Sequence, residues 1–168
     1  MLVKEFITNV LIKEIKEIQQ DCGYHYLSFG LISQGIEFLG ACIDDFEFEE
    51  RNKSKERFNN AIKELFPEKY HDYIFKQKEQ FDLYSNLRCG ILHVVVPGSF
   101  IELIQESEIE KFGTHLEHRT IRGNERLILV SQILMSDFEN ACNQIISQIE
   151  NREISNPKVY KNLISTSL

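Results

Sequence analysis

An arginine and a histidine stand five residues apart, as Arg88 and His93, in an otherwise neutral stretch of the chain. Arginine is always charged, and its planar fork matches two phosphate oxygens. Histidine can take up and release a proton near neutral pH. One group can exchange protons while the other stabilises charge on phosphorus oxygens, so the pair predicts binding of, or attack on, a phosphodiester. The structural alternative is an ion pair at Arg88 and a hydrogen-bonded histidine at position 93.

The spacing of this pair sets a geometric condition. On an ideal α-helix, five residues correspond to a rotation of about 140°, so the two side chains would not lie side by side. Two arrangements would bring such groups together. Either the helix is irregular, which Gly90 makes less costly, or the site is completed by a second copy across a two-fold interface.

The apolar pattern places the pair on a helix over about residues 76–95. That helix ends at Pro97-Gly98, because the residue before a proline is pushed out of the helical region. Apolar residues at helical intervals predict further helices in the chain. They cover about residues 2–20, 26–44, 54–66 and 133–149.

The segment 26–44 differs from the other helices because apolar residues cover most of its circumference, which predicts a central, buried helix. It contains Gly30, Gly35 and Gly40, each of which lowers helix stability by about 1 kcal/mol relative to alanine. A glycine in such a place allows close backbone approach. We therefore expect a neighbouring helix to pack tightly against this one.

Residues 100–130 follow a different pattern. The segment 100–105 predicts a short strand, and 116–121 and 126–130 flank Gly123-Asn124, which is typical of a β-hairpin. The tail, about residues 151–168, is expected to be either a short docked helix or loosely ordered. The predicted fold is therefore mainly α, a single domain over residues 1–168, with a small β-hairpin insert near residues 100–130.

Composition narrows the partners and the location. The net charge is −7, from 19 basic and 26 acidic side chains, which counts against strong non-specific binding of nucleic acid. No stretch approaches the roughly 20 apolar residues of a membrane-spanning helix, and the first residues lack the order of a secretory signal. We expect a cytoplasmic protein without a membrane partner. The four cysteines form no C-x-x-C pair and are expected to be reduced.

Three weaker clusters favour structural interpretations. The acidic run 44–50 has no calcium-loop spacing, so we interpret it as a solvated connection before a helix. The segment 115–118 holds two histidines and a glutamate, but strand alternation separates them, so we expect a solvated hairpin and no metal site. Arg119, Arg122 and Arg126 could steer RNA or protect an exposed strand edge, and we favour the second. No cofactor is expected.

The segment 81–98 resembles the R-x4–6-H helix of the HEPN superfamily (higher eukaryotes and prokaryotes nucleotide-binding). The resemblance lies in Tyr84 and Leu87 before the arginine, Gly90 two positions after it, and Pro97 beyond the histidine. The helix that contains residues 35–42 is similar to the packing partner of that motif. The resemblance covers these two helices and, loosely, the helical order. The insert at 100–130 is not part of the common core.

The resemblance implies a helical bundle, commonly dimerised with the two motifs facing each other. It also implies a metal-independent endoribonuclease of toxin–antitoxin or antiviral systems. Arg88 would then stabilise the phosphorane-like charge and His93 would act as general acid or base. Supporting residues would be Tyr84, Asn86 and Cys89, although the family usually has a polar residue where this chain has Cys89.

Two other hypotheses follow from Cys89 and the acidic charge. One is a non-catalytic HEPN-like module that binds a nucleotide, an RNA or a cognate protein. The other is a structural helical domain whose insert mediates protein interaction. The nuclease and the binding module predict a concave, locally positive groove at Arg88, whereas the structural domain predicts an Arg88 held in an ion pair.

Overall fold

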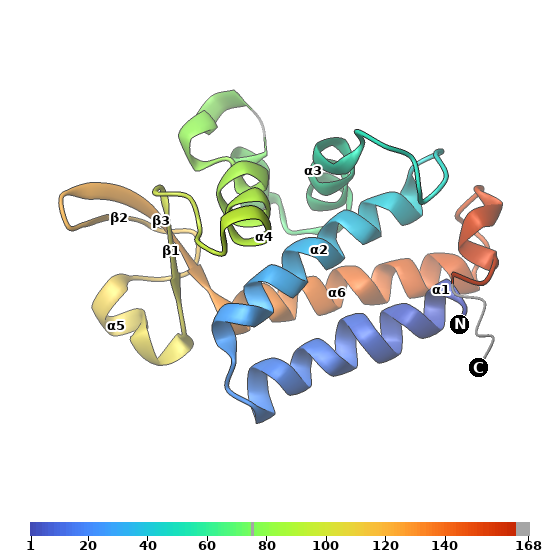
Figure 1. Ribbon diagram of the computed structural model, residues 1–168, viewed down its shortest axis with the longest axis horizontal. Helices are drawn as coiled ribbons and strands as arrows, with labels where there is room; N and C mark the ends of the chain where they lie inside the picture. Colours follow the sequence, from blue (N-terminus) through green and yellow to red (C-terminus); the bar gives the residue numbers. More distant parts are fainter. Residues whose placement is uncertain (75, 164–168) are drawn as a thin grey trace.

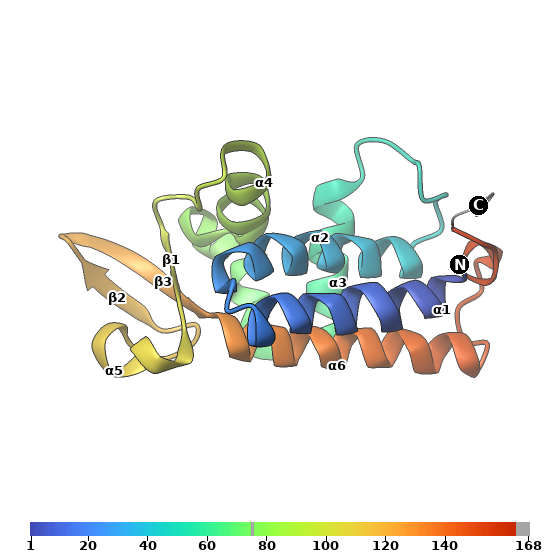
Figure 2. The same ribbon diagram turned by 60° about the horizontal axis from the view of Figure 1, so that its bottom comes forward.

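Three long helices lie side by side along the molecule in a computed structural model that describes residues 1–74 and 76–163 (Figures 1 and 2). The first consists of α1 (Val3–Phe6) and the π-helical segments Ile7–Glu14 and Glu17–Asp21. The others are α2 (His25–Ile43) and α6 (Ser131–Glu150). The helices predicted over 2–20, 26–44 and 133–149 are therefore confirmed, and the fold is mainly helical.

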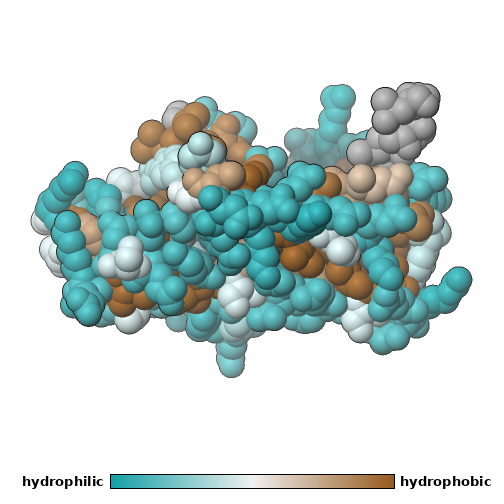
Figure 3. Space-filling model, turned by 90° about the horizontal axis from the view of Figure 1, so that it is seen from below, coloured by the Kyte–Doolittle hydropathy of each residue, from teal (hydrophilic) through white to brown (hydrophobic). Residues whose placement is uncertain are grey.

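The outer helices are amphipathic. The first helix turns Val3, Ile7, Leu11 and Ile15 into the core, and α6 does the same with its own apolar stripe. From below, the molecule shows a mostly hydrophilic surface with separate apolar patches in it (Figure 3). The polar residues of these two helices therefore form part of the outer surface. α2 lies between these helices and the elements that pack on its other side.

Two further helices pack across α2. They are α3 (Ser54–Leu65) and a helix over residues 83–94, here called the motif helix, which combines the π-helical segment Tyr84–Cys89 with α4 (Gly90–Val94). Figure 1 shows the motif helix between α3 and a small sheet. The buried residues of all five helices form one core around α2.

The glycines of α2 explain how closely its neighbours approach. A Cβ added at Gly40 would lie 1.9 Å from the carbonyl oxygen of Arg57 in α3, and one at Gly35 would lie 2.3 Å from the ring of Phe138 in α6. No side chain fits at either distance. The prediction that glycines let neighbouring helices approach α2 closely is confirmed, for α3 through its backbone and for α6 through a ring.

Among the described residues, α2 is also the one helix whose length and composition would suit a membrane span, with a mean hydropathy of 1.3 over its most apolar window. Of that window, 61% is buried inside the fold. The expectation that no stretch comes near such a length was therefore too strict. Burial among other helices accounts for the apolar composition of α2.

The insert is a three-stranded sheet rather than a hairpin alone. Its strands are β1 (Ile101–Ile104), β2 (His118–Ile121) and β3 (Asn124–Val130), in the order β1-β3-β2. The β2–β3 pair is the predicted antiparallel hairpin. β1 pairs with β3 in parallel, with α5 (Ile109–Phe112) in the connection. The strand was predicted, but its parallel pairing was not, because it depends on a crossover that local pattern does not specify.

The tail is docked as far as the structure describes it. After α6 the chain forms a 3-10 helix, Pro157–Tyr160, whose Val159 is buried. Asn162 forms a bridge to Leu2, and the backbone amide of Leu163 donates to the carbonyl oxygen of Met1 at 3.0 Å. Both ends of the described chain therefore meet at one end of the molecule (Figure 1). Residues 164–168 lie outside the described part.

The interpretation of segment 115–118 as a solvated hairpin is wrong for both histidines. His115 Nδ1 accepts from the backbone amide of Val130 at 2.9 Å, and its Nε2 lies 2.7 Å from the hydroxyl of Tyr70. That hydroxyl donates to Asp137 at 2.7 Å. His118 Nε2 lies 3.2 Å from the hydroxyl of Tyr73. Through these contacts the insert is anchored to the helical core.

The His115 anchor predicts a loss of stability in acid. Burial, followed by the nearby Lys69 ammonium, lowers the pKa of His115 from 6.5 to about 4. Between these pH values the unfolded chain binds the proton and the folded chain does not, so stability falls as pH drops from 6.5 to 4. The pKa shift corresponds to at most about 3 kcal/mol. Urea unfolding at pH 7 and pH 4.5 measures this loss.

A matched pair of variants isolates the contribution of this histidine. His115→Gln removes its titration and is expected to flatten the pH dependence over that range. His93→Gln, at an exposed histidine, is expected to leave the dependence unchanged. An equally steep dependence in His115→Gln and in the parent would contradict the assignment.

Candidate functional site

The expected single helix over residues 76–95 is wrong, because the chain breaks before the motif. A 3-10 helix, Lys76–Phe81, comes first. The carboxylate of Asp82, a buried residue, then accepts from the backbone amide of Ser85 at 2.8 Å. This contact satisfies an amide that the start of a helix leaves unpaired, so Asp82 begins a separate motif helix that carries Arg88 and His93.

The first part of the motif helix departs from α-helical geometry. Residues Tyr84–Cys89 are π-helical, and α-helical geometry resumes at Gly90. The π-helical turn ends at Cys89, so Arg88 lies in it and His93 lies in the α-helical segment that follows. Arg88 Nη1 lies 3.4 Å from His93 Nε2. Arg88 and His93 therefore approach each other within one chain, next to an irregular turn of the helix.

A return loop over residues 95–98 packs on this irregular turn. The backbone amide of Gly98 donates to the carbonyl oxygen of Asn86 at 2.8 Å. Val95 adopts φ 60°, a conformation that strains a β-branched residue. A Cβ at Gly90 would lie 2.7 Å from the carbonyl oxygen of Val96, so glycine is required for this contact. The loop follows His93 directly and fixes the end of the helix beside it.

Glu37 of α2 holds the arginine, and the sequence analysis did not identify it. Arg88 Nε and Nη2 each lie 2.8 Å from Glu37 Oε2, while Nη1 faces His93. Burial lowers the pKa of Arg88, but the Glu37 carboxylate opposes this, and the net pKa is raised. The available signal was that Glu37 is the single charged residue between positions 26 and 43. A lone charge on a buried helix requires a partner.

A concave pocket of about 280 Å³ opens beside the pair. It lies between α2, the motif helix, the loop after α2 and the docked tail. Its lining includes Gln34, Glu37, Phe38, Phe48, Arg88 and Leu163. Arg88 therefore lies in a concavity, as the nuclease and the binding module predict, and in an ion pair, as the structural domain predicts.

The three supporting residues have different positions. Tyr84 lies against the arginine, with its ring centroid 5.5 Å from Arg88 Cζ. The half-buried thiol of Cys89 lies next to the hydroxyl of Tyr84. Burial, and then a hydrogen bond with this thiol, raises the pKa of Tyr84. Asn86 points away from the pair, because its side-chain amide donates to the carbonyl oxygens of Gln80 and Asp82. Tyr84 and Cys89 therefore lie beside Arg88, whereas Asn86 stabilises the start of the motif helix.

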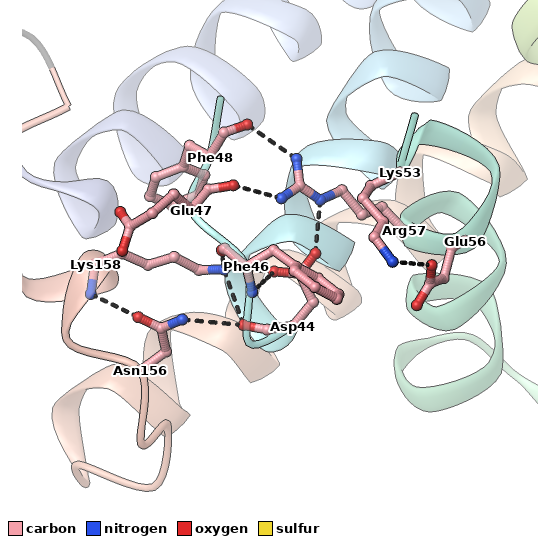
Figure 4. Close-up of polar contacts among 9 residues, drawn as sticks. All are labelled: Asp44, Phe46, Glu47, Phe48, Lys53, Glu56, Arg57, Asn156 and Lys158. Carbon is pink, nitrogen blue, oxygen red and sulfur yellow. Dashed lines mark hydrogen bonds and ion pairs between the residues drawn. The ribbon is translucent and has the colours of Figure 1, made fainter. Parts of the chain in front are cut away.

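A buried polar network holds the far wall of the pocket (Figure 4). Asp44, which ends α2, binds two cations from distant parts of the chain. Arg57 Nε donates to Asp44 Oδ2 at 2.6 Å, and Lys158 Nζ donates to Asp44 Oδ1 and, at 2.8 Å, to the Asp44 carbonyl oxygen. The interpretation of the acidic run as solvated is therefore wrong for Asp44, which sequence alone does not distinguish from its exposed neighbours.

The same cations fix the loop that follows α2. Arg57 donates to the carbonyl oxygens of Glu47 and Phe48 at 2.6 and 2.9 Å, and Lys158 donates to that of Phe46. Phe48 then stacks on Phe38 of α2, with ring centroids 5.4 Å apart and an interplanar angle of 4°. The network thus positions an aromatic wall of the pocket.

Two of the three hairpin arginines are paired with carboxylates. Arg119 pairs with Glu117 at 2.8 Å and Arg126 with Glu102 at 2.6 Å, so the hairpin carries no concentrated positive charge. Within the described ranges, no three histidine, cysteine or carboxylate side chains are grouped to hold a metal ion.

The comparisons with known proteins do not assign this site to a family. No protein-family model, no curated protein and no solved structure matches the chain.

Proposed function

We propose that the protein is a metal-independent endoribonuclease of the type that residues 81–98 resemble, with Arg88 and His93 as its catalytic residues. The observation that carries the proposal is the 3.4 Å contact between Arg88 Nη1 and His93 Nε2. An irregular helix, a return loop and a glutamate from another helix all maintain this contact. His93 is exposed, so a phosphodiester can reach it.

The geometry suits attack by the ribose 2′-hydroxyl on the adjacent phosphate. In this mechanism His93 Nε2, which faces Arg88 Nη1, is the general base that takes the proton of the hydroxyl once the substrate lies between the two side chains. The O2′–P bond forms and the P–O5′ bond breaks, and the proton passes to the departing 5′-oxygen. Arg88 stabilises the negative charge that develops on the phosphorus oxygens. The products are a 2′,3′-cyclic phosphate and a 5′-hydroxyl.

Glu37 supports this chemistry by orienting the guanidinium. Glu37 Oε2 binds the Nε and Nη2 groups of the Arg88 guanidinium. The third nitrogen, Nη1, is left facing His93. A fixed donor is more effective than a mobile one, because no reorganisation is needed when charge develops.

The second candidate function is a non-catalytic module that binds a nucleotide, an RNA or a partner protein at the same site. Cys89, in place of a polar residue, and the neutralisation of Arg88 by Glu37 favour it. In either case we propose a HEPN-like bundle that acts in the cytoplasm. We also propose that it forms a homodimer with facing motif helices, in a toxin or defence setting.

Cleavage of single-stranded RNA in excess EDTA tests the proposal. The purified chain is expected to produce fragments that end in a 2′,3′-cyclic phosphate, because the nucleophile is the adjacent hydroxyl and not a metal-bound water. Cleavage that requires added divalent cation would contradict the mechanism. Binding of RNA by folded protein with no cleavage across several RNAs would support the non-catalytic module instead.

A further inference from the structure

The pocket beside the Arg88–His93 pair has features of a site for one RNA base. Its volume of about 280 Å³ is just below the roughly 300–1,000 Å³ of ligand pockets, so it suits a small planar group. Phe38 and Phe48 supply an apolar wall, and Arg88 belongs to both the pocket and the catalytic pair. A base in the pocket would therefore lie next to a phosphate at Arg88.

We propose that this pocket selects unpaired bases whose ring N–H stands next to a carbonyl, namely guanine and uracil, over adenine and cytosine. The proposal rests on the proposed function, because it places the base of the nucleotide whose phosphate meets Arg88 and His93.

The floor of the pocket is one face of α2. Gln34, Glu37, Phe38 and Ala41 stand at intervals of three and four residues, so their side chains project from the same side of the helix. The small Ala41 leaves room at one end of this face. The two polar members, Gln34 and Glu37, are neighbours on it.

Both polar members retain unused hydrogen-bonding capacity. Arg88 contacts only Oε2 of Glu37, and no hydrogen bond to Oε1 is formed within residues 1–74 and 76–163. Gln34 is exposed, and its amide also makes no hydrogen bond to the residues that the structure describes. The pocket thus presents a carboxylate acceptor beside an amide that can donate.

This pair of groups discriminates between the bases by their edges. In guanine and uracil, a ring N–H can donate to Glu37 Oε1 while the adjacent carbonyl oxygen accepts from the Gln34 amide. In adenine and cytosine the corresponding ring nitrogen is an acceptor, and its lone pair would face the carboxylate. A hydrogen bond to a charged group contributes about 1.5–3 kcal/mol, so we expect discrimination of at least about tenfold.

Binding of nucleoside 3′-monophosphates to the full chain in EDTA tests the proposal without any cleavage. Calorimetry is expected to give at least about tenfold tighter binding of the guanosine and uridine compounds than of the adenosine and cytidine compounds. N1-methylguanosine and N3-methyluridine monophosphates lack the ring N–H and are expected to lose that advantage. Comparing the guanosine and uridine compounds shows which of the two bases fits the pocket better.

Two single glutamine-to-alanine variants, one in the pocket and one outside it, serve as test and control. Gln34→Ala leaves the Arg88–Glu37 pair in place and is expected to reduce the discrimination several-fold. Gln20→Ala, at an exposed position of the first helix that does not line the pocket, is expected to retain it.

The outcomes separate this inference from the nuclease. Equal affinity for all four compounds, indifference to methylation, or no binding at millimolar concentration would overturn the base pocket even if RNA is cleaved. Selective binding without any RNA cleavage would support the base pocket and contradict the nuclease.

Discussion

Replacing His93 with alanine is expected to slow RNA cleavage by about 10²–10⁴-fold, the usual contribution of a general acid or base. The reason is that Arg88 can still stabilise charge in the variant, but no group remains to take the 2′-hydroxyl proton. Single-turnover rates in EDTA measure the effect. Because His93 is exposed, its removal should change the free energy of unfolding by no more than about 0.5 kcal/mol.

Two companion variants make this result specific. His93→Gln keeps a polar side chain without proton exchange and is expected to be as slow as alanine. Arg88→Ala is expected to lose about 10²–10³-fold, as for other donors that stabilise transition-state charge. Arg122→Ala removes an exposed arginine at the hairpin turn and should retain the parent rate. A His93→Ala protein that cleaves at the parent rate would contradict the proposed mechanism.

Asp44→Asn is expected to lower the free energy of unfolding by about 3–5 kcal/mol, because breaking a buried ion pair leaves an uncompensated charge. The variant would leave two such charges. The side chains of Arg57 and Lys158 are 6% and 1% exposed, and Asp44 is their shared negative partner. Urea or guanidinium unfolding followed by circular dichroism measures the loss.

The neighbouring carboxylate supplies the control for this variant. Asp45 is exposed, so Asp45→Asn should stay within about 0.5 kcal/mol of the parent. Burial raises the pKa of Asp44, but the hydrogen bonds from Lys158 and Arg57 together lower it by more. The pKa of Asp44 is therefore below its ordinary value. The stability that this carboxylate provides is therefore present above its ordinary pKa and lost as pH falls through the lowered value. A loss below about 1 kcal/mol in Asp44→Asn would show that the network adds little to stability.

The core-forming elements were predictable from the sequence because their signals are local. The apolar circumference and the glycines of 26–44 indicated a buried helix with close neighbours, and α2 has both properties. The hairpin was predictable from Gly123-Asn124 between alternating strands, but its turn lies one residue earlier, at Arg122 and Gly123, which have positive φ angles, and Asn124 begins β3. Each signal is periodicity or turn chemistry within a few residues.

The candidate pair was also evident from residue type, but its geometry was not. The sequence predicted Arg88 and His93 as the site and left two ways to bring them together. The break at Asp82, the π-helical turn and the return loop decided between these ways. An irregular turn depends on what packs against the helix. The apolar periodicity continues through this turn without a change, so the sequence pattern does not indicate the irregularity.

The partners of the charged residues were decided by tertiary structure alone. Glu37 and Arg88 are 51 residues apart, and Asp44 and Lys158 are 114 apart, so neither pairing leaves a local pattern. The same holds for His115, which contacts Tyr70 across 45 residues. Sequence determined which side chains are apolar and which could do chemistry. Packing decided which charges meet, because only the folded core removes water from them and makes each pairing necessary.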